Sequence, residues 1–398
     1  MSYKKWVNAE IDKAKASALS EKLNIDAFVA FLLVSRGIDD ELAASEFLSD
    51  GCRFSSPYLL KDMDKAVKRI NRALDDGESI CIYGDYDCDG VTSTALLYTF
   101  LSALGGFVSY YIPNRATDGY GMNFKAIDKI KADGTDLIIT VDNGISSIEE
   151  AEYIYSLGMQ LIVTDHHQIG ENLPRAEAVI NPHREDNEIE FRDFAGVGVA
   201  FKLACALYDG DVEDLLEDYA DYVTIGTIGD MVPLLNENRA IVKAGLKLIN
   251  TDAKIGISAL KKSTNSKAEH FSATDVAFQI CPRINAAGRM DTANLAVDLL
   301  TCEDNEIAEY KAEQLNLENT HRHEVEEKID NDIAEIMAND RAYQTDRVIV
   351  VAGHNYHKGV IGICAAHLVE LYSKPAIVIG IDDEGNATGS ARSIDGFN

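Results

Sequence analysis

The stretch that decides the fold is Ser79-Ile80-Cys81-Ile82-Tyr83-Gly84-Asp85-Tyr86-Asp87-Cys88-Asp89-Gly90-Val91. Its first five residues are a short apolar run that ends at a glycine, which predicts a buried strand. A loop with three aspartates follows over 85–90, and the apolar spacing of 91–104 predicts a helix. A strand, a polar loop and a helix in this order are half of a βαβ unit, so the stretch predicts an α/β domain.

The same alternation continues after this stretch. Apolar runs with the length of strands take turns with helical stretches, and parallel strands need such crossover helices. We therefore expect a mostly parallel sheet with helices on both faces. Further strands are expected at 107–112, 137–141, 161–164 and 178–180, and further helices at 123–132, 147–157, 196–208, 212–228 and 240–262.

The chain is expected to have four parts. They are an N-terminal helical segment (1–75), the main α/β domain (76–302), a long charged connecting helix (303–340) and the start of a second, smaller α/β domain (341–398). We place the domain boundary inside the long helix. The elements expected in the outer parts are helices at 9–23, 26–35, 39–48, 62–75 and 359–372, and strands at 347–352 and 375–380.

The composition is that of a globular protein, with 46% hydrophobic and 26% charged residues among 398. The longest plain apolar run, 27–34, is far shorter than the ~20 residues that cross a bilayer, and the amino end lacks an apolar signal core. We therefore expect a soluble, cytoplasmic protein with no membrane partner. The seven cysteines are scattered without a C-x-x-C pair, which favours reduced core thiols over a zinc ribbon or a disulfide framework.

The net charge is strongly negative, at 37 − 66 = −29. Taken alone, this charge argues against a nucleic-acid partner, because phosphate binding is driven by Lys and Arg. A basic groove on an acidic body would be compatible with the same balance. So would acidic side chains gathered around metal ions, or an acidic host proteome.

Acidic residues gather at four points that carry most of the chemical signal. Three points follow expected strands, namely the aspartates of 85–89, Asp142 and Asp165-His166-His167, and a fourth, Asp230, follows a helix. Since the carboxyl ends of parallel strands share one edge of a sheet, we expect the first three points to meet there. Carboxylates and imidazole without thiolate suit manganese or magnesium, and two such ions bridged by a carboxylate can hydrolyse phosphoesters.

Each point also has a plainer interpretation. Aspartates after a strand can serve as turn and N-cap residues, and a single Asp-Asn-Gly is commonly a turn. An EF-hand loop would need a glutamate at its twelfth position, which is Leu96 here. The residues Asp87, Asp89, Gly90, Val91 and Thr92 resemble a phosphatase motif that is phosphorylated on its first aspartate, but that motif leaves Asp165-His166-His167 unexplained.

Taken in order, these points resemble the motifs of the DHH phosphoesterase superfamily, and further stretches resemble its RecJ branch, the single-strand-specific 5′-to-3′ exonucleases. The ordered set is far more specific than any single motif. The superfamily motifs are Gly84-Asp85-Tyr86-Asp87-Cys88-Asp89-Gly90, Asp142-Asn143-Gly144, Asp165-His166-His167 and Gly229-Asp230. The branch motifs are Ile112-Pro113-Asn114-Arg115, Asn181-Pro182, 196–202, 283–289, 357–362 and 389–393.

The resemblance implies a site for two ions of Mn²⁺, or Mg²⁺ in its place. Asp165 would orient a histidine, and His167 would contact the scissile phosphate or assist the leaving oxygen. The implied metal ligands are Asp87 with Asp85 for the first ion, Asp89, His166 and Asp230 for the second, and Asp142 as the bridge between both. The residues implied to hold the substrate backbone or its 5′ phosphate are Arg115, Arg289, Ser390 and Arg392. His357 and Lys358 are further candidates, because they precede an expected helix start, where an anion is favoured.

Two glycine-containing stretches are expected to allow close approach. Gly196 and Gly198 do not complete a dinucleotide fingerprint, because position 201 is Phe where the third glycine would stand. We expect them to allow close helix packing. The stretch Asn285-Ala286-Ala287-Gly288 is expected to let backbone approach the substrate.

The first hypothesis is therefore an exonuclease that acts on single-stranded DNA in recombination and repair, with other repair proteins as further partners. A DHH relative that cleaves short oligonucleotides or cyclic dinucleotides is the enzymatic alternative. A non-catalytic DNA-binding or scaffold protein of the same fold could dispense with the metal ligands, all of which are present here. Since the family's second domain continues through a Gly-Gly-His segment and a barrel often follows it, we expect this sequence to be a fragment.

Overall fold

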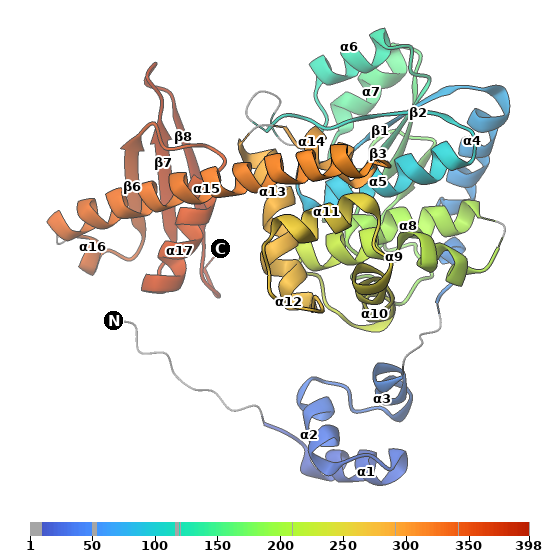
Figure 1. Cartoon of the computed structure of the whole chain (residues 1–398), viewed down its shortest axis with the longest axis horizontal. Coiled ribbons are helices and arrows are strands. Elements are labelled where there is room, and N and C mark those ends of the chain that lie inside the picture. The colour runs from blue at the N-terminus through green and yellow to red at the C-terminus, as the bar shows by residue number, and fades with distance from the viewer. Residues whose placement is uncertain are drawn as a thin grey trace.

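The computed structural model describes residues 10–49, 54–115, 119, 121–208, 210–290, 292–340 and 342–397. A large lobe contains a five-stranded sheet, and a small lobe with a three-stranded sheet lies at the other end of one long helix (Figure 1). A group of three short helices near the amino end forms a separate body below the large lobe (Figure 1).

The large sheet is entirely parallel, as the alternation of strands and helices predicts. Its strand order is β2-β1-β3-β4-β5. The three inner strands, β1, β3 and β4, are almost wholly buried, as is the short edge strand β5, which explains their continuous apolar sequences. The strands are β1 (Ser79–Tyr83), β2 (Phe107–Tyr111), β3 (Leu137–Val141), β4 (Gln160–Thr164) and β5 (Ala178–Ile180).

Helices cover both faces of this sheet, which confirms the doubly covered α/β domain. Alternate strand residues point to opposite faces. Ile80 and Ile139 share a core with α4 (Met63–Asp76), α5 (Cys88–Ala103) and α8 (Gly196–Leu207). On the other face, Cys81 and Ile138 share a second core with α6 (Phe124–Ala132) and α7 (Ile148–Ser156).

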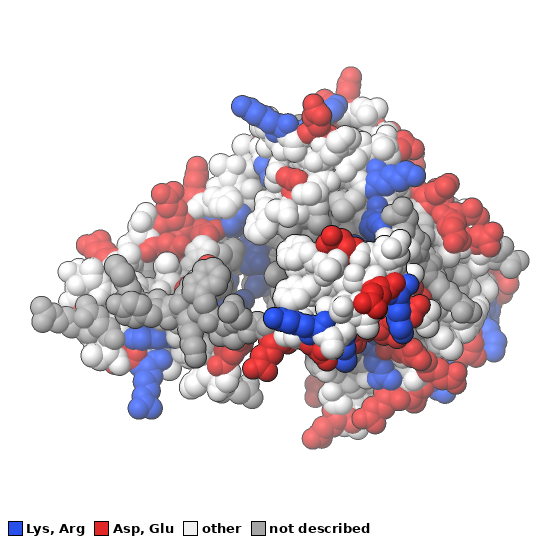
Figure 2. Space-filling view, turned by 90° about the horizontal axis from the view of Figure 1, so that it is seen from below, with Lys and Arg blue, Asp and Glu red and all other residues white. Residues whose placement is uncertain are grey.

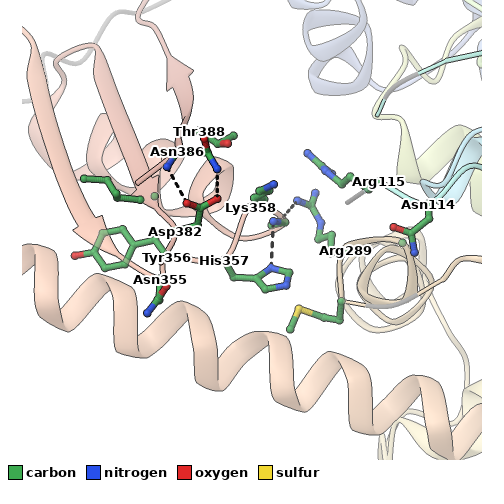
Figure 3. A pocket seen from close by; sticks show the side chains of 15 residues that line it. Asn114, Arg115, Arg289, Asn355, Tyr356, His357, Lys358, Asp382, Asn386 and Thr388 are labelled. Atoms are coloured by element: carbon green, nitrogen blue, oxygen red, sulfur yellow. Dashed lines mark hydrogen bonds between the residues drawn. The ribbon is translucent and has the colours of Figure 1, made fainter. Parts of the chain in front are cut away.

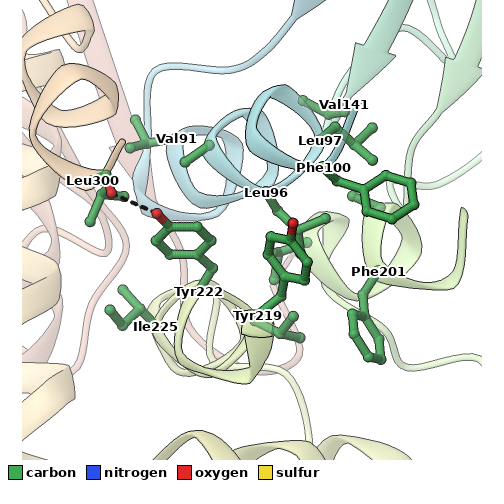
Figure 4. Close-up of a cluster of buried hydrophobic side chains, with 14 of the residues drawn as sticks. Val91, Leu96, Leu97, Phe100, Val141, Phe201, Tyr219, Tyr222, Ile225 and Leu300 are labelled. Atoms are coloured by element: carbon green, nitrogen blue, oxygen red, sulfur yellow. Dashed lines mark hydrogen bonds between the residues drawn. The ribbon is translucent and has the colours of Figure 1, made fainter. Parts of the chain in front are cut away.

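A further layer of helices packs behind α5. Leu96, Leu97 and Phe100 of α5 face aromatic side chains of α8 and α9 (Figure 4). The hydroxyl of Tyr222 donates a 2.6 Å hydrogen bond to the carbonyl of Leu300 (Figure 4). The layer consists of α9 (Val212–Gly229), α10 (Asn236–Thr251), α11 (Ile255–Ser263), α12 (Ala273–Asp275), the π-helical turn η2 (Val276–Ile280), α13 (Cys281–Met290) and α14 (Asn294–Leu300).

The single helix expected over 240–262 is wrong, because the chain breaks between α10 and α11. Asp252 leaves helical geometry with φ −151° and ψ 49°. The break follows Asn250 and Thr251, which are weak helix formers, and the side-chain amide of Asn250 donates to the carbonyl of Phe271 at 2.9 Å. The apolar spacing continues across the break and hides it in the sequence.

The long helix α15 (Asn305–Asn339) joins the two lobes. Ala308, Ala312 and Leu315 pack in the core of the large lobe, whereas Ile329 and Ile333 pack in that of the small lobe. In the small sheet β6 pairs parallel with β7, and β8 pairs antiparallel with β7, a strand that the apolar pattern did not indicate. The remaining elements are α16 (Ala342–Thr345), β6 (Ile349–His354), α17 (Ile361–Tyr372), β7 (Ala376–Ile381) and β8 (Ala387–Arg392).

The helices near the amino end form a small core of their own. Arg239 of α10 stacks on the ring of Phe47 at 3.8 Å and donates to its carbonyl, which ties this group to the large lobe. Helix α4, which we placed in the N-terminal segment, packs on the large sheet instead. The group consists of α1 (Lys13–Leu23), α2 (Ala27–Ser35) and α3 (Glu41–Leu48), followed by η1 (Pro57–Leu59). Within the described residues, no helix has the length and apolar character to cross a membrane.

Two leucines allow a matched test of this core. Leu97 is fully buried between the sheet and α9, whereas Leu42 of α3 is 76% exposed. We expect Leu97→Ala to lower the free energy of unfolding by about 3–5 kcal/mol, since it leaves a cavity, and Leu42→Ala to change it by less than about 0.5 kcal/mol. Urea denaturation of both variants measures the difference, and equal effects would contradict this packing.

Candidate metal centre and phosphate cavity

The loop after β1 places three aspartates around the first turn of α5. Asp87 is the N-cap, and its Oδ1 accepts hydrogen bonds from the amides of Asp89 and Gly90, both at 3.0 Å. The helix therefore begins at Cys88, three residues before the expected start at Val91. The interpretation of Asp87 as an N-cap is thus also correct, and the cap fixes Asp89 in a buried position beside it.

Asp89 is held by the amino end of a second helix. Its two carboxylate oxygens accept hydrogen bonds from the amides of Gly196, at 2.6 Å, and Val197, at 2.8 Å. These amides belong to the first turn of α8, where unpaired N–H groups and the helix dipole favour an anion.

Asp142 lies at the end of β3 in a left-handed conformation, with φ 61°. A Cβ on Gly196 would lie 2.7 Å from Oδ1 of Asp142, so only glycine leaves room for this carboxylate. We expected Gly196 to serve helix packing, and its close neighbour is instead a site residue. Within the described chain, Asp142 Oδ1 is buried and receives no hydrogen bond.

The two histidines after β4 approach these carboxylates differently. His166 Nε2 is 3.0 Å from Asp142 Oδ1, 3.6 Å from Asp89 Oδ2 and 3.7 Å from an oxygen of Asp230, the residue that ends α9. His167 Nδ1 is 2.7 Å from Asp165 Oδ1 and 4.0 Å from Asp142 Oδ1. Asp165 therefore orients the ring of His167.

All of the residues proposed as metal ligands come together at this edge of the sheet. Each of three sets has ligand atoms within 4.8 Å of one another. Asp142 belongs to two of the sets and lies beside a residue of the third. The sets are Asp85, Asp87 and Asp142; Asp89, His166 and Asp230; and Asp142, His166 and His167.

The electrostatics of the cluster suit divalent cations. Burial and the neighbouring Asp87 raise the pKa of Asp85 to about 7 and that of Asp230 to about 6. Burial and nearby carboxylates also raise the pKa of Asp89 and of Asp142 well above the usual range. A pair of cations would relieve this repulsion and would give the unpaired oxygen of Asp142 a partner.

The two histidines have opposite pKa shifts. Burial and the neighbouring His167 lower the pKa of His166 to about 4, so at neutral pH its ring is neutral and offers a lone pair to a metal ion. The hydrogen bond that His167 donates to Asp165 is the main cause that raises the pKa of His167 to about 9, so His167 is protonated and can also donate to an anion. For Asp165 itself, burial acts against ionisation, but the bond with His167 outweighs it and lowers the pKa.

A cavity of about 450 Å³ opens beside the cluster, between the two lobes. Figure 3 shows the side chains of Arg115, Arg289 and Lys358 pointing into it. Arg289 donates to the carbonyl of Gly359, and the amide of Gly359 donates to Nδ1 of His357 (Figure 3). Although burial and then Arg115 lower the pKa of Arg289 to about 10, Arg289 stays charged at neutral pH.

The surface shows the same contrast between the cavity and the rest of the molecule. Lys and Arg side chains lie deep in the hollow between the lobes, whereas Asp and Glu side chains are spread over the outside (Figure 2). The hollow is therefore a basic groove on an acidic body, which is one of the alternatives that the net charge of −29 left open.

Two of the expected substrate residues lie outside the lining of this cavity. Ser390 and Arg392, on β8, flank Gly362 at the start of α17, and Arg392 donates to the carbonyl of Ala391. Thr388, two residues before Ser390 on the same strand, does line the cavity.

Residues 285–288 of helix α13 contact the loop after β1, and Gly288 also lines the cavity, so the expectation that this stretch lets backbone approach the substrate stays a prediction. Asn285 Oδ1 accepts a 2.8 Å hydrogen bond from the amide of Cys88. A Cβ on Gly288 would lie 2.2 Å from the carbonyl oxygen of Tyr86. Sequence reasoning also missed Tyr86 itself, whose ring faces Arg115, and the Asp-x-Asp signal around it drew attention only to its neighbours.

A separate group of potential ligands lies in the small lobe. Glu326, Asp330 and His367 have ligand atoms within 4.8 Å, but Arg322 already donates to Glu326 at 2.5 Å and His367 pairs with Asp330 at 2.9 Å. This group satisfies itself as a network of ion pairs, and we assign no ion to it.

Comparison with known proteins decides the family. The family model described as DHH family, N-terminal domain, matches residues 79–227. The single-stranded-DNA-specific exonuclease RecJ of Bacillus subtilis (strain 168) is 42% identical over 396 residues, which are 99% of this chain and 50% of that protein. A crystal structure of exonuclease RecJ bound to manganese has 32% sequence identity and a TM-score of 0.75, and the match covers 87% of this chain and 85% of that one. The chain belongs to the RecJ family.

A second RecJ structure has a similar overall fold. RecJ from Thermus thermophilus, in complex with Mn²⁺, has 30% sequence identity and a TM-score of 0.80. That match covers 97% of this chain and 55% of the Thermus protein. The chain thus spans about half the length of the curated RecJ from Bacillus subtilis.

The raised carboxylate pKa values make a prediction about stability. Because the folded, cation-free protein holds protons on Asp85 and Asp230 that the unfolded chain releases, its stability should fall as pH rises from about 4 to about 7. At pH 8, Mn²⁺ or Mg²⁺ in hundredfold excess over its Kd should raise the unfolding temperature by roughly 5–10 °C.

Thermal unfolding with and without cations measures this effect. The variant Asp142→Asn should show a weaker dependence on both pH and cation, whereas Asp133→Asn, on the exposed surface, should behave as the unchanged protein does. A cation-free protein that is most stable above pH 7 would contradict the described cluster.

Proposed function

We propose that this chain is a metal-dependent exonuclease that hydrolyses single-stranded DNA from its 5′ end, in recombination and repair. The observation that carries the proposal is the buried cluster of carboxylates and histidines beside a basic cavity. The RecJ relatives, which are named as single-stranded-DNA-specific exonucleases, support the substrate. The cytoplasm as the place of action and other repair proteins as partners stay predictions.

The donor set fits two divalent ions. We assign Asp87, with Asp85, to one ion, Asp89, His166 and Asp230 to the other, and Asp142 to both. Manganese and magnesium favour carboxylate and imidazole donors of this kind, and the RecJ structures described as bound to manganese or in complex with Mg²⁺ support the choice. When bound, the ions supply Lewis acidity at the phosphoryl oxygens and lower the pKa of attacking water.

The protein's own groups complete the chemistry. To His167, which is protonated and oriented by Asp165, we assign the donation of a proton to the leaving oxygen or of a hydrogen bond to the phosphate. The amides of Gly196 and Val197 fix Asp89 and so preorganise the site before a substrate binds. The neutral ring of His166 avoids placing a further positive charge next to the ions.

The basic cavity binds the backbone of the single-stranded DNA. Arg115, Arg289 and Lys358 offer cations for a phosphate oxygen, and arginine adds a planar fork of donors. Because the cavity lies between two lobes, a strand that reaches the metal centre contacts both. We infer that the phosphate at the 5′ end is held here while the next phosphodiester bond is at the metal centre.

Replacing the bridging carboxylate tests the metal centre. We expect Asp142→Asn to lower the hydrolysis of a 5′-labelled single strand of tens of nucleotides by roughly 10³-fold or more while it keeps the fold. The surface variant Asp133→Asn serves as the control. Retained activity in Asp142→Asn would count against a bridging role.

The length of the substrate separates this function from the alternative. A DHH relative that cleaves short oligonucleotides or cyclic dinucleotides would ignore the long strand and turn over substrates of a few nucleotides. Degradation of a long single strand by stepwise release of nucleotides from the 5′ end is the outcome expected here.

The cavity is tested by removing one of its cations. We expect Arg115→Ala to raise the KM for single-stranded DNA roughly tenfold with little change in kcat. The slope of log binding constant against log salt concentration should become shallower by about 1, as expected for the loss of one phosphate contact. Arg175→Ala, which removes an exposed arginine of the ion pair with Glu152, is the matched control. A changed kcat with an unchanged KM would contradict a role in strand binding.

A further inference from the structure

Tyr86 lies where the loop that carries the metal-ligand aspartates (85–89, the metal loop) meets the basic cavity between the lobes. It stands between Asp85 and Asp87, two of the residues assigned to the ions, and its ring is half-buried. The guanidinium carbon of Arg115 lies 5.1 Å from the centre of this ring, within the range of a cation–π contact. Tyr86 thus links the loop that carries the metal ligands to Arg115 of the cavity.

The backbone of Tyr86 is fixed from two sides. Its amide donates a 2.8 Å hydrogen bond to Oδ1 of Asp85. Its carbonyl lies against Gly288 of α13, so closely that a Cβ on Gly288 would approach it to 2.2 Å. The point from which the ring projects is therefore fixed relative to both the loop after β1 and α13.

The side chain of Tyr86 also interacts electrostatically with Arg289, the other arginine of the cavity. Burial raises the pKa of the Tyr86 hydroxyl, and the charges of Arg115 and, more weakly, Arg289 act in the opposite direction. Arg289 is anchored through its bond to the carbonyl of Gly359 in the small lobe. Arg115 instead follows β2 in a loop and meets the flat face of Tyr86.

We propose that Tyr86 is a positioning residue whose ring sets the position of Arg115, and thereby the span between the held 5′ phosphate and the metal centre. This inference rests on the proposed exonuclease function. It assigns to the ring a role in product size, because the number of nucleotides between the held phosphate and the cleaved bond is the length of the product. The ring acts through Arg115 and takes no part in the chemistry.

The experiment compares three variants of the full chain. Tyr86→Phe keeps the ring face, and Tyr86→Leu removes it at similar bulk. Tyr155→Leu is the matched control, because Tyr155 carries an arginine over its ring in the same way, with Arg175 at 4.1 Å, on the far face of the sheet. The substrates are single-stranded oligonucleotides with a 5′ phosphate or a 5′ hydroxyl.

The expected result is a split between binding and turnover. Tyr86→Leu should raise the KM for the 5′-phosphorylated strand several-fold to about tenfold, keep kcat within about threefold, and release di- and trinucleotides besides mononucleotides. Its preference for a 5′ phosphate over a 5′ hydroxyl should shrink by the same factor. Tyr86→Phe and Tyr155→Leu should match the unchanged chain in all these respects.

Three outcomes would overturn the inference. They are an unchanged KM and product size in Tyr86→Leu, an equal defect in Tyr86→Phe, and loss of the Mn²⁺-dependent rise in unfolding temperature in Tyr86→Leu. The last result would show that the ring supports the metal loop itself.

The failure of the exonuclease function is recognised separately. In that case the unchanged chain is inactive on both oligonucleotides. Fluorescence anisotropy of the same 5′-phosphorylated and 5′-hydroxyl strands then still reports whether Tyr86→Leu weakens the preference for the phosphate. An unweakened preference would overturn the positioning role on its own.

Discussion

The crowding of carboxylates at one edge of the large sheet is the constraint on which the rest of the structure depends. Like charges held a few ångströms apart and away from water repel, and the protein compensates only part of that repulsion itself. The first turn of α5 holds Asp87, the first turn of α8 holds Asp89, and His167 holds Asp165. Asp142 keeps one oxygen without a donor in the described chain, and that deficit is what a cation satisfies.

The parallel sheet explains why the centre could be foreseen from the sequence. Buried parallel strands are continuous apolar runs, so β1, β3 and β4 were visible, and the residues that follow them must share an edge. The elements that escaped prediction are those whose signal is weak or ambiguous. The break at Asp252 lies within unbroken apolar spacing, and β8 carries few apolar residues because it lies at the edge of the small sheet.

The contacts between distant segments could not be predicted in the same way. Gly196 is required by Asp142, and Gly288 by Tyr86, but in each case the partner is far away in the sequence. The same holds for the cavity, where the arginines of the large lobe meet residues of the small one, and where Thr388 replaces the expected Ser390 and Arg392 in the lining. The motifs in the sequence indicated which residues could belong to the site. Which of them line the cavity depends on how the helices and the two lobes pack.

Helix α15 has a mechanical consequence for the cavity between the lobes. Its 35 residues make a rod of roughly 50 Å, rooted at one end in the core of the large lobe and at the other in that of the small lobe. A bend of about 10° near its middle would move the far wall of the cavity by roughly 4 Å while both hydrophobic cores stay intact. The width of the cavity is therefore governed by the bending stiffness of α15 and by the bond between Arg289 and Gly359 that joins the lobes, and not by the stability of either lobe.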